Sequence, residues 1–151
     1  MDLDLVFFGT SGSVPTAQRA PSALLLRRGG ERLLFDCGEG TQRQMLRSAV
    51  GLIELREVFV SHFHADHYLG LPGMLKTFDL RGRERPLAIH GPPGLKELLV
   101  LAARHHGIAT FADRLTAAVA TALYPGWGNA LSEPPSFNAY RLFVAGLRDI
   151  K

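Results

Sequence analysis

The sequence contains very little cysteine, since Cys37 is the only one among 151 residues. A single cysteine rules out a framework of internal disulfides and a zinc cluster built from several thiolates, and it fits a reducing compartment. No apolar run approaches the roughly 18 residues that a membrane-spanning helix needs. The acidic start, Met1-Asp2-Leu3-Asp4, lacks the basic segment of a signal peptide. We therefore expect a cytoplasmic protein that does not enter a membrane.

Lysine is also scarce, because 14 of the 17 basic side chains are arginine. The net charge is +3, and a content of 46% hydrophobic and 21% charged residues is ordinary for a globular domain with a core. Arginine suits bidentate contacts with phosphate, so the composition permits a nucleic-acid partner. A solvated basic surface accounts for the arginines equally well. Charge alone therefore selects no partner.

Short apolar runs alternate with helical segments over about the first 108 residues. Two of the runs are separated only by Gly29-Gly30, which predicts a β-hairpin and an antiparallel start to the sheet. Beyond about residue 110 the pattern weakens, although 114–124 could form an alanine-rich helix. The interleaving predicts an α/β fold, with strands over 3–8, 23–28, 32–35, 57–60 and 86–90 and helices over 42–50, from 69 onward, and over 95–106.

Two loops rich in small residues interrupt this pattern. The loop over 9–15 lacks the Gly-Lys-Ser/Thr of a Walker loop. Its glycines suit a turn between strands, and its amides could also cradle an anion. The second loop, 36–40, precedes Thr41 and Gln44, whose spacing is that of a capping box. This predicts the start of the helix over 42–50, with Met45 and Leu46 turned inward.

Residues 61–67, Ser-His-Phe-His-Ala-Asp-His, place three imidazoles and a carboxylate directly after an apolar strand. His62 and His64 are two apart, so in an extended backbone both point the same way and can close on one ion. Asp66 and His67 would then face a second. Imidazole nitrogen and carboxylate oxygen are ligands of zinc in catalytic sites. Surface histidines at a strand end would explain one or two of these residues. Four potential ligands where α/β folds bind their ligands predict a two-metal hydrolase centre.

Three stretches of the chain together carry a resemblance to a known family. They are 8–15 (Phe-Gly-Thr-Ser-Gly-Ser-Val-Pro), 35–42 (Phe-Asp-Cys-Gly-Glu-Gly-Thr-Gln), and 62–67 followed by Gly70-Leu71-Pro72-Gly73. They resemble the metallo-β-lactamase superfamily and, within it, ribonuclease Z, the endonuclease family that trims the 3′ trailer from precursor tRNA. The middle stretch points most narrowly to ribonuclease Z. The resemblance covers residues 1 to about 108 and implies a metallo-β-lactamase-like αββα sandwich, of which this chain holds about one half.

The resemblance also implies roles for individual residues. His62 and His64 would bind one zinc ion, Asp66 and His67 would bind the other, and Asp66 would also accept a proton in catalysis. Asp36 would steady the histidine loop, as such carboxylates commonly do. Two zinc ions per complete site, a precursor tRNA substrate and a homodimer are implied as well.

The chain departs from the family where the site should be completed. In the family a histidine, a bridging aspartate and a final histidine come from the second half of a chain roughly twice this length. Here no histidine follows His106, and neither Asp113 nor Asp149 has a recognisable ligand context. The basic Gly/Pro-rich arm is absent, and His90 stands where relatives tend to have an aromatic residue. We expect residues 1–112 to form the N-terminal half of the domain and 113–151 to be a tail that is truncated or frame-shifted relative to the family.

Three functions stay open at this point. The first is a zinc-dependent endoribonuclease that removes the 3′ trailer from precursor tRNA, with its site incomplete in this chain. The second is another hydrolase of the same fold, acting on a lactone, thioester, sulfate ester or cyclic nucleotide. The third is an inactive binding or assembly partner. His/Asp sites also accept manganese and iron. Arg81, Arg83 and Arg85 could contact RNA phosphates, or could simply be solvated.

Overall fold

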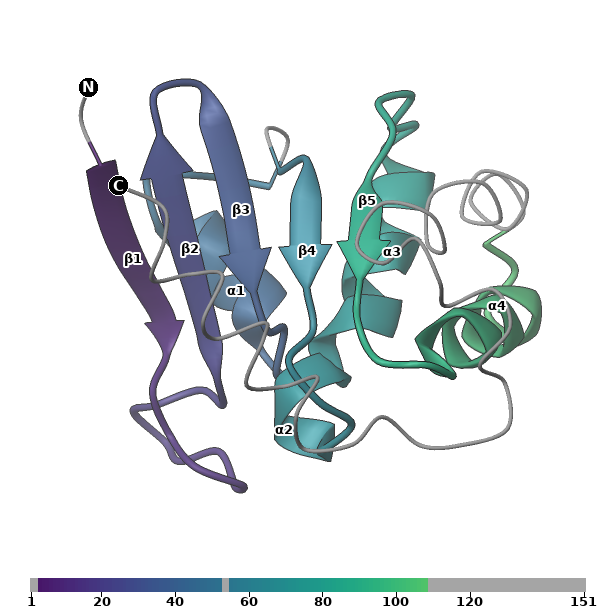
Figure 1. Cartoon of the computed structure of the whole chain (residues 1–151), viewed down its shortest axis with the longest axis horizontal. Coiled ribbons are helices and arrows are strands. Elements are labelled where there is room, and N and C mark those ends of the chain that lie inside the picture. Colours follow the sequence, from purple (N-terminus) through teal and green to yellow (C-terminus); the bar gives the residue numbers. More distant parts are fainter. Residues whose placement is uncertain (1–2, 53–54, 109–151) are drawn as a thin grey trace.

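The computed structural model describes residues 3–52 and 55–108. These residues form a five-stranded sheet in the order β1-β2-β3-β4-β5 (Figure 1). β1 pairs with β2 and β2 with β3 in antiparallel fashion, whereas β3–β4 and β4–β5 are parallel. Four strands therefore run in one direction and end at one edge of the sheet, the lower edge in Figure 1. The strands are β1 (Leu3–Gly9), β2 (Ala23–Arg28), β3 (Glu31–Phe35), β4 (Glu57–Phe59) and β5 (Ala88–His90).

Helices pack against one face of this sheet, and α4 lies beyond β5 (Figure 1). α3 presents an apolar stripe at the spacing i, i+3, i+4, i+7, which is one face of a helix. The stripe packs with the inward residues of the central strands into a single core, and each such side chain stabilises the fold by about 1.5–3 kcal/mol. None of the described helices has the length and apolarity to cross a bilayer. The helices are α1 (Thr41–Arg47), α2 (Ala65–Tyr68), α3 (Gly70–Leu80) and α4 (Leu95–His105), and the stripe is Leu71, Met74, Leu75 and Phe78.

The α/β class, the opening meander and the five strands are confirmed, each strand within two residues of its expected bounds. The hairpin turns at Gly29, whose φ of 56° suits glycine. The helices over 95–106 and from residue 69 are confirmed as α4 and α3. The expected helix over 114–124 and the tail over 113–151 lie outside the described residues.

The predicted start of α1 is wrong in its capping. Gly40, with a φ of 82°, is the N-cap, and no side chain caps the helix. Thr41 instead lies inside the first turn, fully buried, and its hydroxyl donates to the carbonyl of Gly38 at 2.8 Å. The helix ends at Arg47 rather than 50. Met45 is buried as expected, but Leu46 is 45% exposed, because consecutive residues point about 100° apart around a helix.

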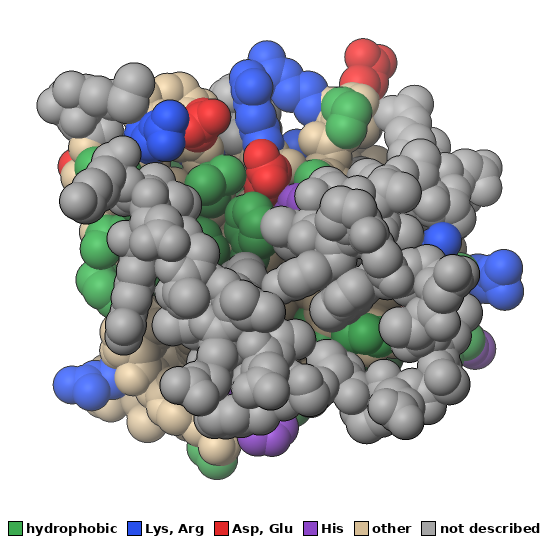
Figure 2. Space-filling view, in the orientation of Figure 1, with side chains coloured by type: hydrophobic (Ala, Val, Ile, Leu, Met, Phe, Trp, Pro, Cys, Tyr) green, Lys and Arg blue, Asp and Glu red, His purple; other side chains and the backbone are tan. Residues whose placement is uncertain are grey.

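The face of the sheet turned away from the helices is also apolar. Phe35 stacks on Phe59 with ring centroids 5.1 Å apart, and Phe59 stacks on His90 at 4.6 Å. His90 is buried at the end of β5, and its Nε2 lies 3.2 Å from a carboxylate oxygen of Glu57. Along β1 the same face stays open, and Figure 2 shows hydrophobic side chains at the left where β1 runs. The exposed residues there are Leu3, Leu5 and Phe7, at 62%, 56% and 64%.

Two glycines let the loop after β3 touch the start of α3. A Cβ on Gly70 would lie 2.2 Å from the carbonyl oxygen of Gly38, and a Cβ on Gly38 would lie 2.4 Å from that of Asp66. Gly70 donates its N–H to the carbonyl of Cys37 at 2.8 Å, and Cys37 donates to the carbonyl of His67 at 2.7 Å. This close backbone contact fixes α2 and α3 against the loop that follows β3.

Replacing Gly70 by Ala should therefore lower the free energy of unfolding by about 1–3 kcal/mol, because the added methyl group collides with backbone atoms. Gly73→Ala in the same helix is the matched control, since nothing lies within 4 Å of its Cβ and alanine favours helices over glycine by up to about 1 kcal/mol. Thermal denaturation followed by circular dichroism measures both. A melting temperature for Gly70→Ala equal to that of Gly73→Ala would contradict the packing described.

Cys37 should be chemically inert in the folded protein. It is fully buried, and that burial raises the pKa of its thiol to about 12, with the nearby Asp36 adding to the rise and a hydrogen bond with Thr41 opposing it. The reactive thiolate is then absent at pH 8. Iodoacetamide at pH 8 should leave Cys37 unmodified in buffer and alkylate it in denaturant, as measured by mass spectrometry. Rapid alkylation in buffer would show that the loop after β3 opens.

Candidate metal centre

The parallel strands deliver the histidine motif and its supporting carboxylate to the same edge of the sheet. Asp36 directly follows β3, and the motif directly follows β4. His64, in an extended conformation, is the N-cap of α2, so Asp66 and His67 lie on a short helix instead of an extended loop. Figure 2 shows a histidine surface at the lower edge of the molecule, where α2 lies in Figure 1. The structure thus brings together all four residues that the sequence singled out.

His62 and His64 form the first donor pair. Nε2 of His62 lies 3.0 Å from Nδ1 of His64, and the two rings meet edge to face with centroids 4.5 Å apart. Zinc–nitrogen bonds of 2.0–2.1 Å at a tetrahedral angle place two nitrogens about 3.3 Å apart. The two nitrogens are therefore spaced to share one ion, as the spacing in the sequence predicted.

Asp66 and His67 form the second donor pair. An oxygen of Asp66 lies 3.4 Å from Nε2 of His67, again close to the separation that one tetrahedral ion requires. The other ring nitrogen of His67, Nδ1, lies 2.7 Å from Asp36. Because Nδ1 donates to that carboxylate, Nε2 is left with a free lone pair. The ring of His67 lies 3.9 Å from that of His62, so the two pairs form one cluster.

Asp36 holds the cluster together through both carboxylate oxygens. One oxygen accepts from the backbone N–H of Ser61 at 2.8 Å and from its hydroxyl at 2.7 Å. The other accepts from His67 at 2.7 Å and from the hydroxyl of Ser22 at 3.3 Å. Asp36 is the one non-glycine residue with positive φ, 59°, in the described part of the chain. Such a conformation is costly and is kept where surrounding contacts enforce it.

Ser61 and Ser22 are functional candidates that the sequence reasoning did not name. Ser61 contacts Asp36 and also approaches Nδ1 of His62 at 3.0 Å. Its place directly before the first histidine was a usable signal, because a hydroxyl there can reach the same ring. Ser22 carried no such signal, since only the fold brings the residue before β2 next to the end of β3.

The electrostatics favour neutral imidazole in the cluster. The pKa of His62 is lowered, first by burial and then by the charges that His67 and His64 would carry, while Asp36 and Asp66 partly oppose the shift. A neutral ring keeps the lone pair that a metal needs. His62 is thus prepared to act as a ligand at neutral pH.

Each donor pair is incomplete within residues 3–52 and 55–108. No three side chains of His, Cys, Asp or Glu converge on one point in this part of the chain. Catalytic zinc sites normally have three protein ligands. Asp113 and Asp149, the carboxylates that the sequence left open, lie outside the described residues.

One of the arginines considered for RNA contact has a structural role instead. The guanidinium of Arg83 donates to the backbone carbonyls of Leu55, Arg85 and Pro86 and lies 4.6 Å above the ring of Phe78. These contacts tie the loop after α3 to the chain before β4. The expectation that Arg83 reaches RNA phosphates is therefore wrong, because its donors already serve the protein backbone.

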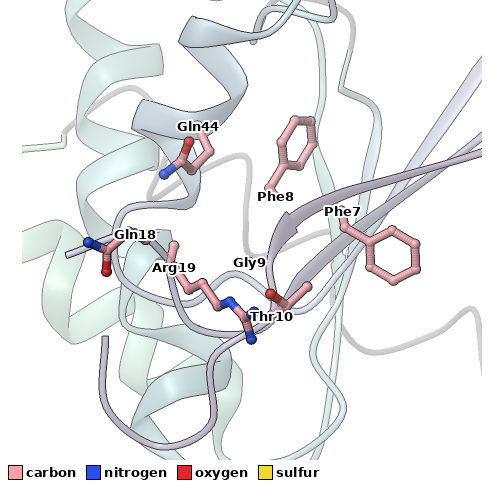
Figure 3. Close-up of a pocket in the computed structure, with 8 residues that line it drawn as sticks. Phe7, Phe8, Gly9, Thr10, Gln18, Arg19 and Gln44 are labelled. Carbon is pink, nitrogen blue, oxygen red and sulfur yellow. The ribbon is translucent and has the colours of Figure 1, made fainter. Parts of the chain in front are cut away.

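A polar pocket lies at the same sheet edge, beside the end of β1 (Figure 3). Its volume is about 210 Å³. The side chain of Arg19 extends toward Thr10, and Gln44 points in from α1. Ser11 donates its N–H to the carbonyl of Ala20 at 3.0 Å, which closes the loop as a turn. The pocket adds a cation, Arg19, that the sequence reasoning missed. Its lining residues are Phe7, Phe8, Gly9, Thr10, Gln18, Arg19, Ala20 and Gln44.

Comparison with known proteins decides the family. A family model described as anti-Pycsar protein Apyc1 matches residues 3–113. The chain belongs to this family. Curated relatives are named ribonuclease Z: that of Methanosarcina mazei is 56% identical over 95 residues, covering 63% of this chain and 31% of the relative. That of Haloferax volcanii is 57% identical over 96 residues, covering 64% and 30%. The resemblance to ribonuclease Z is confirmed.

Solved structures give the fold of this Apyc1-family chain. The short form of human tRNase Z matches with a TM-score of 0.65 and 38% identity, over 68% of this chain and 40% of that one. The metallo-β-lactamase fold protein YhfI from Bacillus subtilis matches with a TM-score of 0.55 and 28% identity, over 64% and 39%. The fold is thus the metallo-β-lactamase fold, in part. The chain spans about a third of the length of the curated relatives.

Asp36→Asn should weaken zinc binding by roughly 10- to 100-fold, the usual cost of losing a carboxylate that orients a ligand histidine. Asparagine keeps the size and tolerates positive φ, but one of its two ends can no longer accept a hydrogen bond. Asp4→Asn is the matched control, since Asp4 is exposed and pairs with Arg27 on β2. Competition against a zinc chelator measures the affinities. Equal zinc affinity in the two variants would remove Asp36 from the account.

Proposed function

We propose that this chain is the metal-binding part of a zinc-dependent endoribonuclease that removes the 3′ trailer from precursor tRNA. The observation that carries the proposal is the presence of two donor pairs, at 3.0 Å and 3.4 Å, side by side at one edge of the sheet. Identity of more than 50% to proteins named ribonuclease Z supports it. The proposal includes two zinc ions in a complete site, a homodimer and a cytoplasmic location.

The four residues have separate roles in the proposed reaction. His62 and His64 would hold one ion, and Asp66 and His67 the other. Zinc supplies a Lewis acid and makes water acidic enough to attack a phosphodiester near pH 7. Asp66 accepts the proton in this scheme, since its carboxylate is held beside His67. Asp36 does not react. It fixes His67 in the tautomer that leaves Nε2 free.

RNA binding would use the polar pocket beside β1 as well. Arg19 and Thr10 lie at the same sheet edge as the donor pairs. An arginine guanidinium and a threonine hydroxyl are suited to phosphate oxygens. We include Arg19 in the proposed substrate surface for this reason.

A second candidate function is that of a binding or assembly partner. The presence of two donors per ion, rather than three, favours it for the described residues. In that case a second polypeptide supplies the remaining ligands, and the chain by itself holds zinc weakly. The two candidates share one metal centre and differ in whether this chain cleaves RNA unaided.

A cleavage assay separates these functions. A precursor tRNA with a 3′ trailer is incubated with zinc and the chain, alone or mixed with the remaining two-thirds of the Methanosarcina mazei relative. We expect cleavage after the discriminator base in the mixture. Asp66→Ala should reduce the rate by roughly 100-fold or more, the usual effect of removing a general base. Asp4→Ala, far from the donor pairs, is the control.

Each other outcome has a definite meaning. Equal cleavage by Asp66→Ala would identify a contaminating nuclease and contradict the assignment of Asp66. Cleavage by the chain alone would eliminate the assembly role. Hydrolysis of bis-p-nitrophenyl phosphate without any RNA cleavage would favour another hydrolase of this fold.

A further inference from the structure

One large apolar side chain lies exposed within the candidate metal centre. Phe63 stands between His62 and His64 in the chain and is 39% exposed. Its two neighbours are paired across a distance of 3.0 Å, so the position of its backbone is tied to the first donor pair. A phenylalanine in this place contributes nothing to metal binding. The described core also does not include it.

The ring of Phe63 is held in a fixed orientation. It meets the ring of Tyr68 edge to face, with centroids 5.9 Å apart and an interplanar angle of 89°, a favoured geometry for aromatic pairs. On another side it lies over Gly94, where even a Cβ would come within 3.5 Å of the ring. Gly94 has a φ of 95°, so this position resists a larger residue. Two elements, α2 and the loop before α4, thus support one ring whose remaining surface is open.

An exposed and supported aromatic ring beside a phosphodiester-cleaving centre fits one kind of partner well. Every nucleobase has a flat π face, and stacking on a protein aromatic contributes about 1–3 kcal/mol per base without sequence preference. The neighbouring Leu69, 50% exposed, extends the apolar surface. The area matches a single base better than it matches a helix or a lipid surface, which need a longer apolar stripe.

We propose that Phe63 stacks on the base of a nucleotide adjoining the scissile phosphate and thereby positions single-stranded RNA over the donor pairs. This inference rests on the proposed function, because it takes the metal centre to act on RNA. Phe63 is then a positioning residue that acts on the substrate base, while His62 and His64 hold the ion.

The test measures stacking separately from cleavage. A short oligoribonucleotide with 2-aminopurine next to the cleavage junction is titrated with the chain in the presence of zinc, and quenching of the fluorescence reports stacking. Phe63→Ala should abolish the quenching and weaken binding by roughly 5- to 150-fold, the equivalent of about 1–3 kcal/mol. Phe63→Tyr should keep both. Leu80→Ala is the matched control, since Leu80 is 74% exposed at the far end of α3.

An abasic nucleotide at the same position completes a double-mutant cycle. Wild type and Phe63→Ala should bind the abasic RNA equally, because the base that distinguishes them is gone. A purely structural role would instead weaken the binding of both RNAs by the same factor. The zinc content and melting temperature of each variant are recorded, and Phe63→Tyr keeps the test decisive if Phe63→Ala folds poorly.

The outcomes distinguish this inference from the proposed function. If wild type binds the RNA and Phe63→Ala binds it equally with equal quenching, the stacking role is overturned and the nuclease proposal stands. If the zinc-loaded wild type binds no RNA, the proposed function fails and the inference fails with it. Quenching that is lost in Phe63→Ala and kept in Phe63→Tyr supports both.

Discussion

The structure of the site depends on the hydrogen bonds of one carboxylate, Asp36. Its two oxygens accept from Ser61, His67 and Ser22, which belong to three separate segments of the chain. Because the side chain is 8% exposed, these bonds form away from bulk water, where an unpaired acceptor would be costly. They also compensate for the left-handed backbone of Asp36 itself. The path of the histidine loop and the tautomer of His67 both follow from this group.

The sequence predicted the elements whose pattern is local. The stripe of α3 and the alternation of strands and helices are visible in residue spacing alone, and the structure agrees. The sequence did not predict α2, because four residues are too few for a helical pattern. The donation by Thr41 to Gly38 and the backbone contacts of Arg83 depend on distant segments. Their residue types fit a cap and a solvated cation equally well, so only the tertiary structure decides between the roles.

The candidate site was predicted to a similar depth. Two donor pairs follow from the spacing of the motif, and the structure gives their separations. The supporting serines and the pocket at Arg19 could not be predicted, since Ser22, Thr10 and Arg19 reach the centre or its edge only through the pairing of β1 and β2. Two features of the described residues stay incomplete: each pair has two donors, and β1 exposes Leu5 and Phe7 on the face away from the helices. Both features suit completion by further polypeptide.

The central claim is that two separate donor pairs each hold one metal ion. Zinc titration by isothermal calorimetry, on wild type and on His64→Ala and His67→Ala, tests it most directly. We predict two ions per chain for wild type and one for each variant, because each substitution removes one donor of one pair. A single ion in wild type that is lost in both variants would contradict the account, since all four residues would then belong to one site.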